Sequence, residues 1–397
     1  MSKGNISLKR GAWGLIALGI VALFTPAVHA DAALSGEKWV DTLKFSGDMR
    51  IRHEGFYYKQ DGTAANTQDR SRERMRIRFG ALATMQDWTV GLRLASGTGE
   101  QVSTNQTYTN AFSQKGLWID QAYLQWRAHE YLKLTGGRMP NPIWRTYASD
   151  IVWDDDVNPE GYAESVDMPL GDRTAFFANL AQFPLFEARA TPDPWMFANQ
   201  IGTRVKLNED TRLSMAGSYY GFVNEKSAAF GAGVQQQGNS RVGATSQLAT
   251  ALQLFHFTGE LATHLVSLPV SFQGDFVHNA RDSQKAGSNG YQTGAVFGKA
   301  KDAKTWEFAY FWKYAQFNSS FADLADSDFG NGGLNRKGHI FWIAYAPRDY
   351  VQLKAKYFVT ETINPFIQST GLSGATFNGT SNNGNINRFQ LDCVVKF

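Results

Sequence analysis

Residues 386–397 read INRFQLDCVVKF and end the chain on an aromatic residue. Apolar Phe389, Leu391, Cys393, Val395 and Phe397 alternate with polar Arg388, Gln390, Asp392 and Lys396, and Val394 is the one exception. Because successive side chains of a strand point to opposite faces, this pattern predicts a strand with one apolar and one polar face. An open edge of this kind promotes aggregation. A barrel removes that edge, because its last strand pairs with its first.

The same alternation recurs along the chain. Further strands are expected at 43–52, 74–79, 88–95, 122–126, 132–134, 161–167, 174–183, 196–207, 211–222, 251–261, 270–279, 291–299, 305–314, 337–346 and 350–359. With the terminal strand they number about 16, an even count as bacterial single-chain barrels require. The fold class expected is therefore all-β, a transmembrane antiparallel β-barrel.

The connections between these strands alternate in length. Short connections such as 208–210 and 347–349 follow even-numbered strands, and long ones such as 223–249 and 315–336 follow odd-numbered strands. Transmembrane barrels show short periplasmic turns and long external loops, whereas a soluble β-sandwich has no reason to keep that order. We expect both termini on the periplasmic side and one barrel domain, 31–397.

The amino-terminal segment predicts a cleaved secretion signal. Lys3, Lys9 and Arg10 precede the apolar run 13–24, which is too short for a membrane-spanning helix, and Val28-His29-Ala30 suits cleavage after Ala30. Removal of 1–30 takes three of the 39 Lys+Arg and none of the 36 Asp+Glu, which leaves 36 of each. This balance gives no indication of nucleic-acid binding.

Composition separates two classes of exported protein. Aromatic residues make up 14% of the chain, glycines number 38, and Cys393 is the single cysteine. A secreted soluble protein could use disulfides, but one cysteine forms none within the chain. A barrel, whose lipid-facing residues are diluted by alternation, agrees better with these values.

Four stretches resemble a known family. They are Tyr291–Ala300 (YQTGAVFGKA), Thr305–Tyr310 (TWEFAY), Asp326–Gly333 (DSDFGNGG) and Gly47–Arg52 (GDMRIR). The chain is similar in them to the putative porin family of Gram-negative bacterial outer membranes, and the resemblance covers nearly all of the chain after the signal. It implies a single-chain, porin-like barrel and adds little about the solute.

Six arginines fall on the polar face of the first three expected strands: Arg50, Arg52, Arg74, Arg76, Arg78 and Arg93. A charge facing lipid costs about 2–4 kcal/mol near the midplane, so these side chains are expected to line the pore. They could be structural, paired with lumen carboxylates such as Asp48, or form a positive wall that favours anions. Their concentration on adjacent strands favours a lumen field.

The connection 139–160 is the third long one and carries the acids Asp154, Asp155, Asp156 and Glu160. In general porins the third loop folds inward, so by analogy these acids would form a constriction loop opposite the arginines. The alternative is a solvated surface loop, with an adventitious cation on its acids.

Motifs for metal binding or catalysis are missing. Asp323, Asp326 and Asp328 match no calcium-binding spacing, the histidines form no His-x₃-His pair, and there is no Gly-x-Ser-x-Gly motif. We therefore expect no catalytic residues, no metal site and no cofactor.

These observations predict an outer-membrane porin that passes small hydrophilic solutes by passive diffusion and leans toward anions. Alternatives are a channel selective for an anionic sugar or phosphate-like solute, a barrel lipase, and an adhesin. Expected partners are outer-membrane lipids, the barrel-assembly machinery, and two further copies in a homotrimer. In proteins that this chain resembles, the machinery recognises an aromatic terminal residue, which Phe397 supplies.

Overall fold

The computed structural model describes residues 40–59, 69–227, 238–242, 247–282, 287–364 and 385–397. The expected signal segment 1–30 lies outside these residues. The strands within them are β1 (Thr42–Lys59), β2 (Arg70–Met85), β3 (Trp88–Ser96), β4 (Gln106–Thr107), β5 (Leu117–His129), β6 (Leu132–Arg138), β7 (Glu160–Pro169), β8 (Thr174–Pro184), β9 (Trp195–Lys206), β10 (Arg212–Val223), β11 (Gln253–Leu265), β12 (Leu268–Asn279), β13 (Asn289–Gly298), β14 (Thr305–Ala315), β15 (Arg336–Arg348), β16 (Val351–Thr362) and β17 (Asn385–Lys396).

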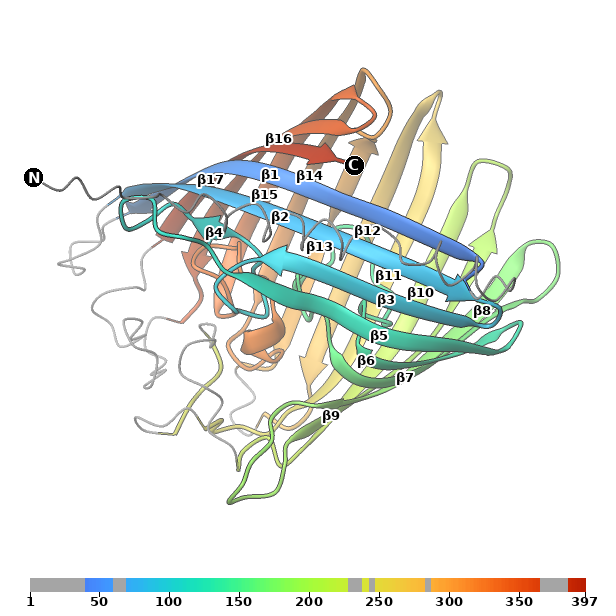
Figure 1. Ribbon diagram of the computed structural model, residues 1–397. Coiled ribbons are helices and arrows are strands. Elements are labelled where there is room, and N and C mark those ends of the chain that lie inside the picture. Colours follow the sequence, from blue (N-terminus) through green and yellow to red (C-terminus); the bar gives the residue numbers. More distant parts are fainter. Residues whose placement is uncertain (1–39, 60–68, 228–237, 243–246, 283–286, 365–384) are drawn as a thin grey trace, which may run out of the picture.

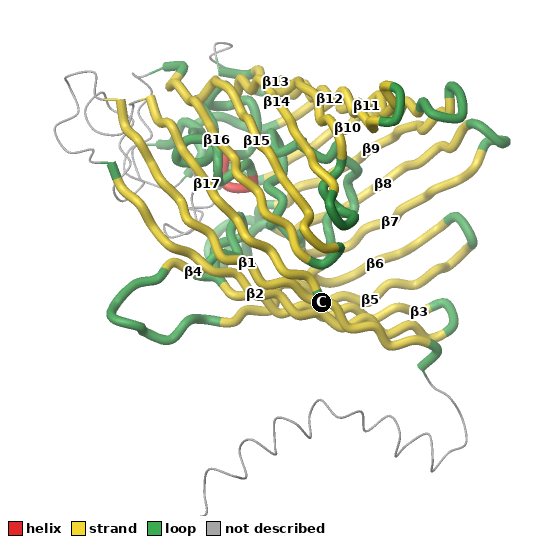
Figure 2. Tube along the Cα trace, turned by 90° about the horizontal axis from the view of Figure 1, so that it is seen from above, coloured by secondary structure: helices red, strands yellow, loops and turns green. Residues whose placement is uncertain are grey.

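The strands form one antiparallel sheet that closes on itself, as Figures 1 and 2 show. β1 pairs with β2 on one side and with β17 on the other, with Ile51 opposite Cys393. At the seam, Gly47 and Phe397 exchange two backbone hydrogen bonds, of 2.8 and 3.0 Å. Because hydrocarbon offers no hydrogen-bonding partner, this closure satisfies the strand edges that an open sheet would leave bare.

The expected strands are confirmed. The sixteen long strands correspond one to one with the sixteen predicted segments, and the final strand does pair with the first. The alternation of short and long connections also holds. One element was not predicted, the two-residue β4 within the second long loop, where Thr107 pairs with Arg74 of β2.

The outward face is apolar and carries stacked aromatic pairs near both ends of the barrel. Trp88–Trp126 and Trp306–Tyr345 stack near the short turns, with ring centroids 5.6 and 4.3 Å apart. Tyr291–Tyr314 stacks near the long loops, at 5.2 Å. Two aromatic girdles that flank an apolar band are the signature of a transmembrane barrel.

The barrel interior is filled in part by long loops. A short 3₁₀ helix, η1 (Ala322–Leu324), lies in the loop after β14, and Figure 2 shows it within the ring of strands. Ile151, Trp153, Phe321 and Ala322 belong to one buried cluster that includes Tyr220 of β10. No helix among the described residues is long and apolar enough to cross a membrane.

Candidate functional site

Register places arginines and carboxylates side by side on the inner face of the barrel. Across the β1–β2 ladder, Asp48 lies opposite Arg78 and Arg52 lies opposite Arg74. Across the β1–β17 ladder, Arg52 lies opposite Asp392. Alternation along each strand thus collects these side chains on one patch of wall, which we call the arginine wall: Arg50, Arg52, Arg72, Arg74, Arg76, Arg78 and Arg388.

Carboxylates of the same strands form ion pairs with the arginines of this wall. Asp48 accepts from Arg76 at 2.7 Å and from Arg78 at 2.7 Å, one on each oxygen. Asp392 accepts two hydrogen bonds from Arg52, at 2.6 and 2.8 Å, a bidentate geometry that suits guanidinium. The pairing with Asp48 that was one of the two sequence interpretations is therefore present.

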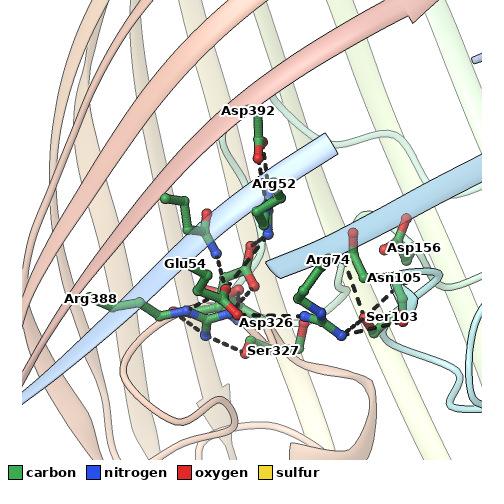
Figure 3. Close-up of polar contacts among 12 residues, drawn as sticks. Arg52, Glu54, Arg74, Ser103, Asn105, Asp156, Asp326, Ser327, Arg388 and Asp392 are labelled. Carbon is green, nitrogen blue, oxygen red and sulfur yellow. Dashed lines mark hydrogen bonds and ion pairs between the residues drawn. The ribbon is translucent and has the colours of Figure 1, made fainter. Parts of the chain in front are cut away.

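Glu54 is the most connected carboxylate of the wall, and it is completely buried. It accepts hydrogen bonds from Arg388, Arg72 and Gln390, the last at 2.8 Å. Figure 3 shows Glu54 beside Arg388. Arg74 approaches to 3.8 Å. A buried carboxylate with this many donors holds the wall together across β1, β2 and β17.

The third long loop, residues 139–159, runs through the interior and contacts distant strands. Its Ser149 donates to Asp275 of β12 at 2.9 Å, and its Trp153 donates to Tyr220 of β10 at 3.2 Å. Asp150 accepts from Lys313 of β14 at 2.6 Å. These contacts place the loop inside the barrel rather than on its surface.

The four predicted acids of this region lie in different environments. Asp156 faces the arginine wall, 3.8 Å from both Arg76 and Arg78. Asp154 is buried and accepts from the backbone of Asp156 and Ser327. Asp155 is 77% exposed and pairs with Arg145 of the same loop, at 2.7 Å.

Glu160 and Arg93 belong to other contacts. Glu160 starts β7 and pairs with Arg138 of β6 at 2.7 Å. Arg93 pairs with Asp120 of β5 at 2.5 Å. Neither reaches the arginine wall through an ion pair within the described part of the chain.

The seventh long loop, residues 316–335, was not predicted to take part. Its Asp328 pairs with Arg388 at 2.6 Å and with Arg52 at 3.3 Å. Its Asp326 accepts from Lys313 at 3.0 Å, so one lysine joins both loops to β14. Asp323 pairs with Arg241 at 3.0 Å. The three aspartates considered for calcium are thus bound to basic side chains.

Burial and neighbouring charge raise the pKa of some acids of the two loops and lower the pKa of others. Burial, followed by the nearby Asp326 carboxylate, raises the pKa of Asp150 to about 7. Burial and Asp156 raise the pKa of Asp154 well above its usual value. Burial also opposes ionisation of Asp328, but Arg388 and Arg52 outweigh it and hold its pKa well below normal.

A cavity of about 320 Å³ lies between the arginine wall and the two loops. Arg50, Arg52, Arg76 and Arg78 line it on one side, and Asp154, Asp155 and Asp156 line it on the other. Arg74, Arg93 and Glu160 are not among its lining residues. A larger cavity of about 610 Å³ at the short-turn end shares Gln352 and Lys396 with it.

Comparison with known proteins agrees with this geometry. A family model described as putative porin matches residues 59–250 and 235–397. The solved structure of Pseudomonas putida OprB at high pH has a TM-score of 0.54 at 11% identity, over 89% of this chain and 94% of that one. A Salmonella typhi OmpF complex with daunomycin gives 0.53 at 10%, over 89% and 97%. No protein of curated function matches the sequence.

Proposed function

Because the chain belongs to the putative porin family of outer-membrane channels, we propose that solutes cross its barrel by passive diffusion through the 320 Å³ cavity. Loop 139–159 is then the constriction loop, and Arg50, Arg52, Arg76 and Arg78 line the narrow part of the pore. The family and the barrel fold indicate a channel rather than an enzyme. The cavity between oppositely charged walls is the observation that carries the proposal.

The size and polarity of the path support small hydrophilic solutes. Charged and amide side chains make up most of the lining of the narrow cavity, and they are the groups that replace water around a polar solute. The wider cavity at the short-turn end supplies a mouth that joins it at Gln352 and Lys396. Selection then follows from width and lining charge, and we propose a lean toward anions.

Single-channel recording in planar bilayers tests this function. We expect stepwise conductance in KCl, with current proportional to salt concentration for a simple diffusion pore. Deleting residues 147–155, between the Trp144 and Asp156 contacts, should raise the unit conductance by widening the path. A barrel that inserts but carries no current would reject the proposal. Saturating, solute-specific current would instead favour the selective channel.

Membrane orientation is a second part of the proposal. If the short turns are periplasmic, a protease site inserted at 208–210 is protected in intact cells, whereas one inserted at 111–114, an exposed part of the second long loop, is cleaved. The expected insertion segment 235–240 extends partly outside the described residues, and its residues 238–240 are buried. Cleavage at 208–210 would reverse the orientation.

Assembly into a homotrimer, and recognition of Phe397 by the barrel-assembly machinery, belong to the same proposal. Mass measurement of the detergent-extracted protein distinguishes one copy from three. A monomeric mass under conditions that preserve conductance would reject the homotrimer.

A further inference from the structure

Two lysines of β16 stand in the narrow cavity beside the arginine wall. Lys354 and Lys356 are two residues apart, so they share one face of the strand, and both line the cavity. The ammonium of Lys354 lies 4.4 Å from the ring centre of Trp342, and that of Lys356 lies 4.6 Å from the ring centre of Phe358. Aromatic faces therefore hold both side chains in place.

These lysines differ from the arginines in that neither forms an ion pair within 4 Å with a carboxylate of the described residues. Asp392 lies directly opposite Lys354 in the β16–β17 register, but both of its oxygens accept from Arg52, at 2.6 and 2.8 Å. Each of the four lining arginines, by contrast, lies within 4 Å of a carboxylate. Cation–π contact positions an ammonium without neutralising it.

The loop acids near these lysines form ion pairs with other cations. Asp150 and Asp326 accept from Lys313, and Asp155 pairs with Arg145. Asp328 pairs with Arg388. Lys313, Arg145 and Arg388 do not line the cavity, so these cations neutralise the loop acids from outside it. A solute in the cavity thus meets ion pairs on most sides. On β16 it meets two ammoniums that attract these acids at longer range but form no ion pair with them among the described residues.

We propose that Lys354 and Lys356 are the anion-recognition site of this pore, which pairs with the carboxylate or phosphate oxyanion of a passing solute. The inference rests on the proposed diffusion function and names the solute class for its constriction. Two ammoniums on one face can donate hydrogen bonds to two oxygens of one oxyanion. The guanidiniums at this site already form ion pairs with carboxylates, and its amides carry no charge. The paired arginines fix the wall and the loops.

Planar-bilayer recording tests the proposal with the variant Lys354→Gln/Lys356→Gln. Under a tenfold KCl gradient, we expect the wild-type reversal potential to show anion preference and the variant to shift toward cation preference. Block of the chloride current by inorganic phosphate, and separately by acetate, should weaken about tenfold or more, because hydrogen bonds to a charged group are worth about 1.5–3 kcal/mol.

Two controls define the outcome. Lys337→Gln removes a lysine of β15 that pairs with Glu361 at 3.4 Å outside the cavity, and it should leave both readouts unchanged. Lys354→Arg/Lys356→Arg keeps the charge and should keep anion preference. Conductance in the double glutamine variant shows that the barrel is folded and open. Unchanged reversal potential and unchanged block in that conducting variant would overturn the lysine assignment, whereas a silent wild type would reject diffusion itself.

Discussion

Raising the pH from 5 to 8 should loosen the attachment between loops 139–159 and 316–335. Asp150 is buried where these loops meet β14, and its pKa is about 7 because of burial and the adjacent Asp326. The two loops are joined by backbone bonds from Asp154 to Leu324 (2.7 Å) and from Asp326 to Asp150 (3.2 Å). Ionisation of Asp150 puts a second negative charge beside Asp326, so the joined state loses stability.

The magnitude follows from proton linkage. An acid whose pKa is higher in the folded state binds more protons when folded, so its contribution to stability falls as the pH rises. The pKa of Asp150 is about 7 in the attached loop and 3.8 when the loop is detached. Its contribution to the free energy of loop attachment therefore falls by about 3 kcal/mol between pH 5 and 8. Asp154 acts in the same direction. Asp156, Asp326 and Asp328 have lowered pKa values, so they stay ionised throughout this range.

Hydrogen exchange at the amides of Asp154 and Asp326 measures this loss. Expressed as protection factors, which remove the intrinsic pH dependence, protection should fall roughly 100-fold from pH 5 to pH 8. Asp150→Asn keeps the Lys313–Asp326 pair and should abolish most of that fall. Equal wild-type protection at both pH values would refute the reasoning, and so would an equal fall in Asp150→Asn.

Three further changes have defined outcomes. Arg74→Ala/Arg76→Ala/Arg78→Ala should shift the reversal potential toward cation preference, because it leaves Asp48 and Asp156 without Arg76 and Arg78 beside them. The shift should be clearest at low salt, where the screening length is longest, and an unchanged potential in about 0.01 M salt would contradict this reasoning. Phe397→Ala should slow assembly and lower the outer-membrane yield, because the Phe397 ring covers Gly47 at the β1 seam; pulse-chase with wild-type kinetics counts against this. Glu54→Gln should destabilise the barrel by roughly 3–5 kcal/mol, since buried arginines lose their charged partner; an unchanged heat-modification temperature on gels argues otherwise.

The strands could be predicted because their signals are local. Alternation decides which face each residue takes, and turn residues decide where a strand ends, so sixteen strands and the order of their connections follow from short stretches. The terminal strand shows this directly, since Leu391 and Cys393 face outward while Arg388 and Asp392 face inward and are buried. β4 gives no such signal because two residues carry no period.

The site was only partly predictable because its contacts join residues far apart in the chain. Alternation places Arg388 on a polar face, but its partner Glu54 is 334 residues away. The inward course of loop 316–335 depends on Asp326 meeting Lys313 and on Asp328 meeting Arg52, and no spacing in the loop encodes either contact. Lys354 and Lys356 were inside an expected strand, and their polar alternation was the available signal.

The chemistry of the two basic side chains explains why arginine and lysine occupy different places here. Guanidinium is a rigid fork of five donors that binds carboxylates bidentately, as Arg52 binds Asp392, so it suits permanent contacts that hold strands and loops in register. A conducting pore needs binding that is strong enough to admit a solute and weak enough to release it. A compact ammonium that lies against aromatic rings, as Lys354 lies against Trp342 and Tyr147, meets that need, because no ion pair within the described residues must break when the solute arrives. Selectivity should therefore follow the two lysines more closely than the more numerous arginines.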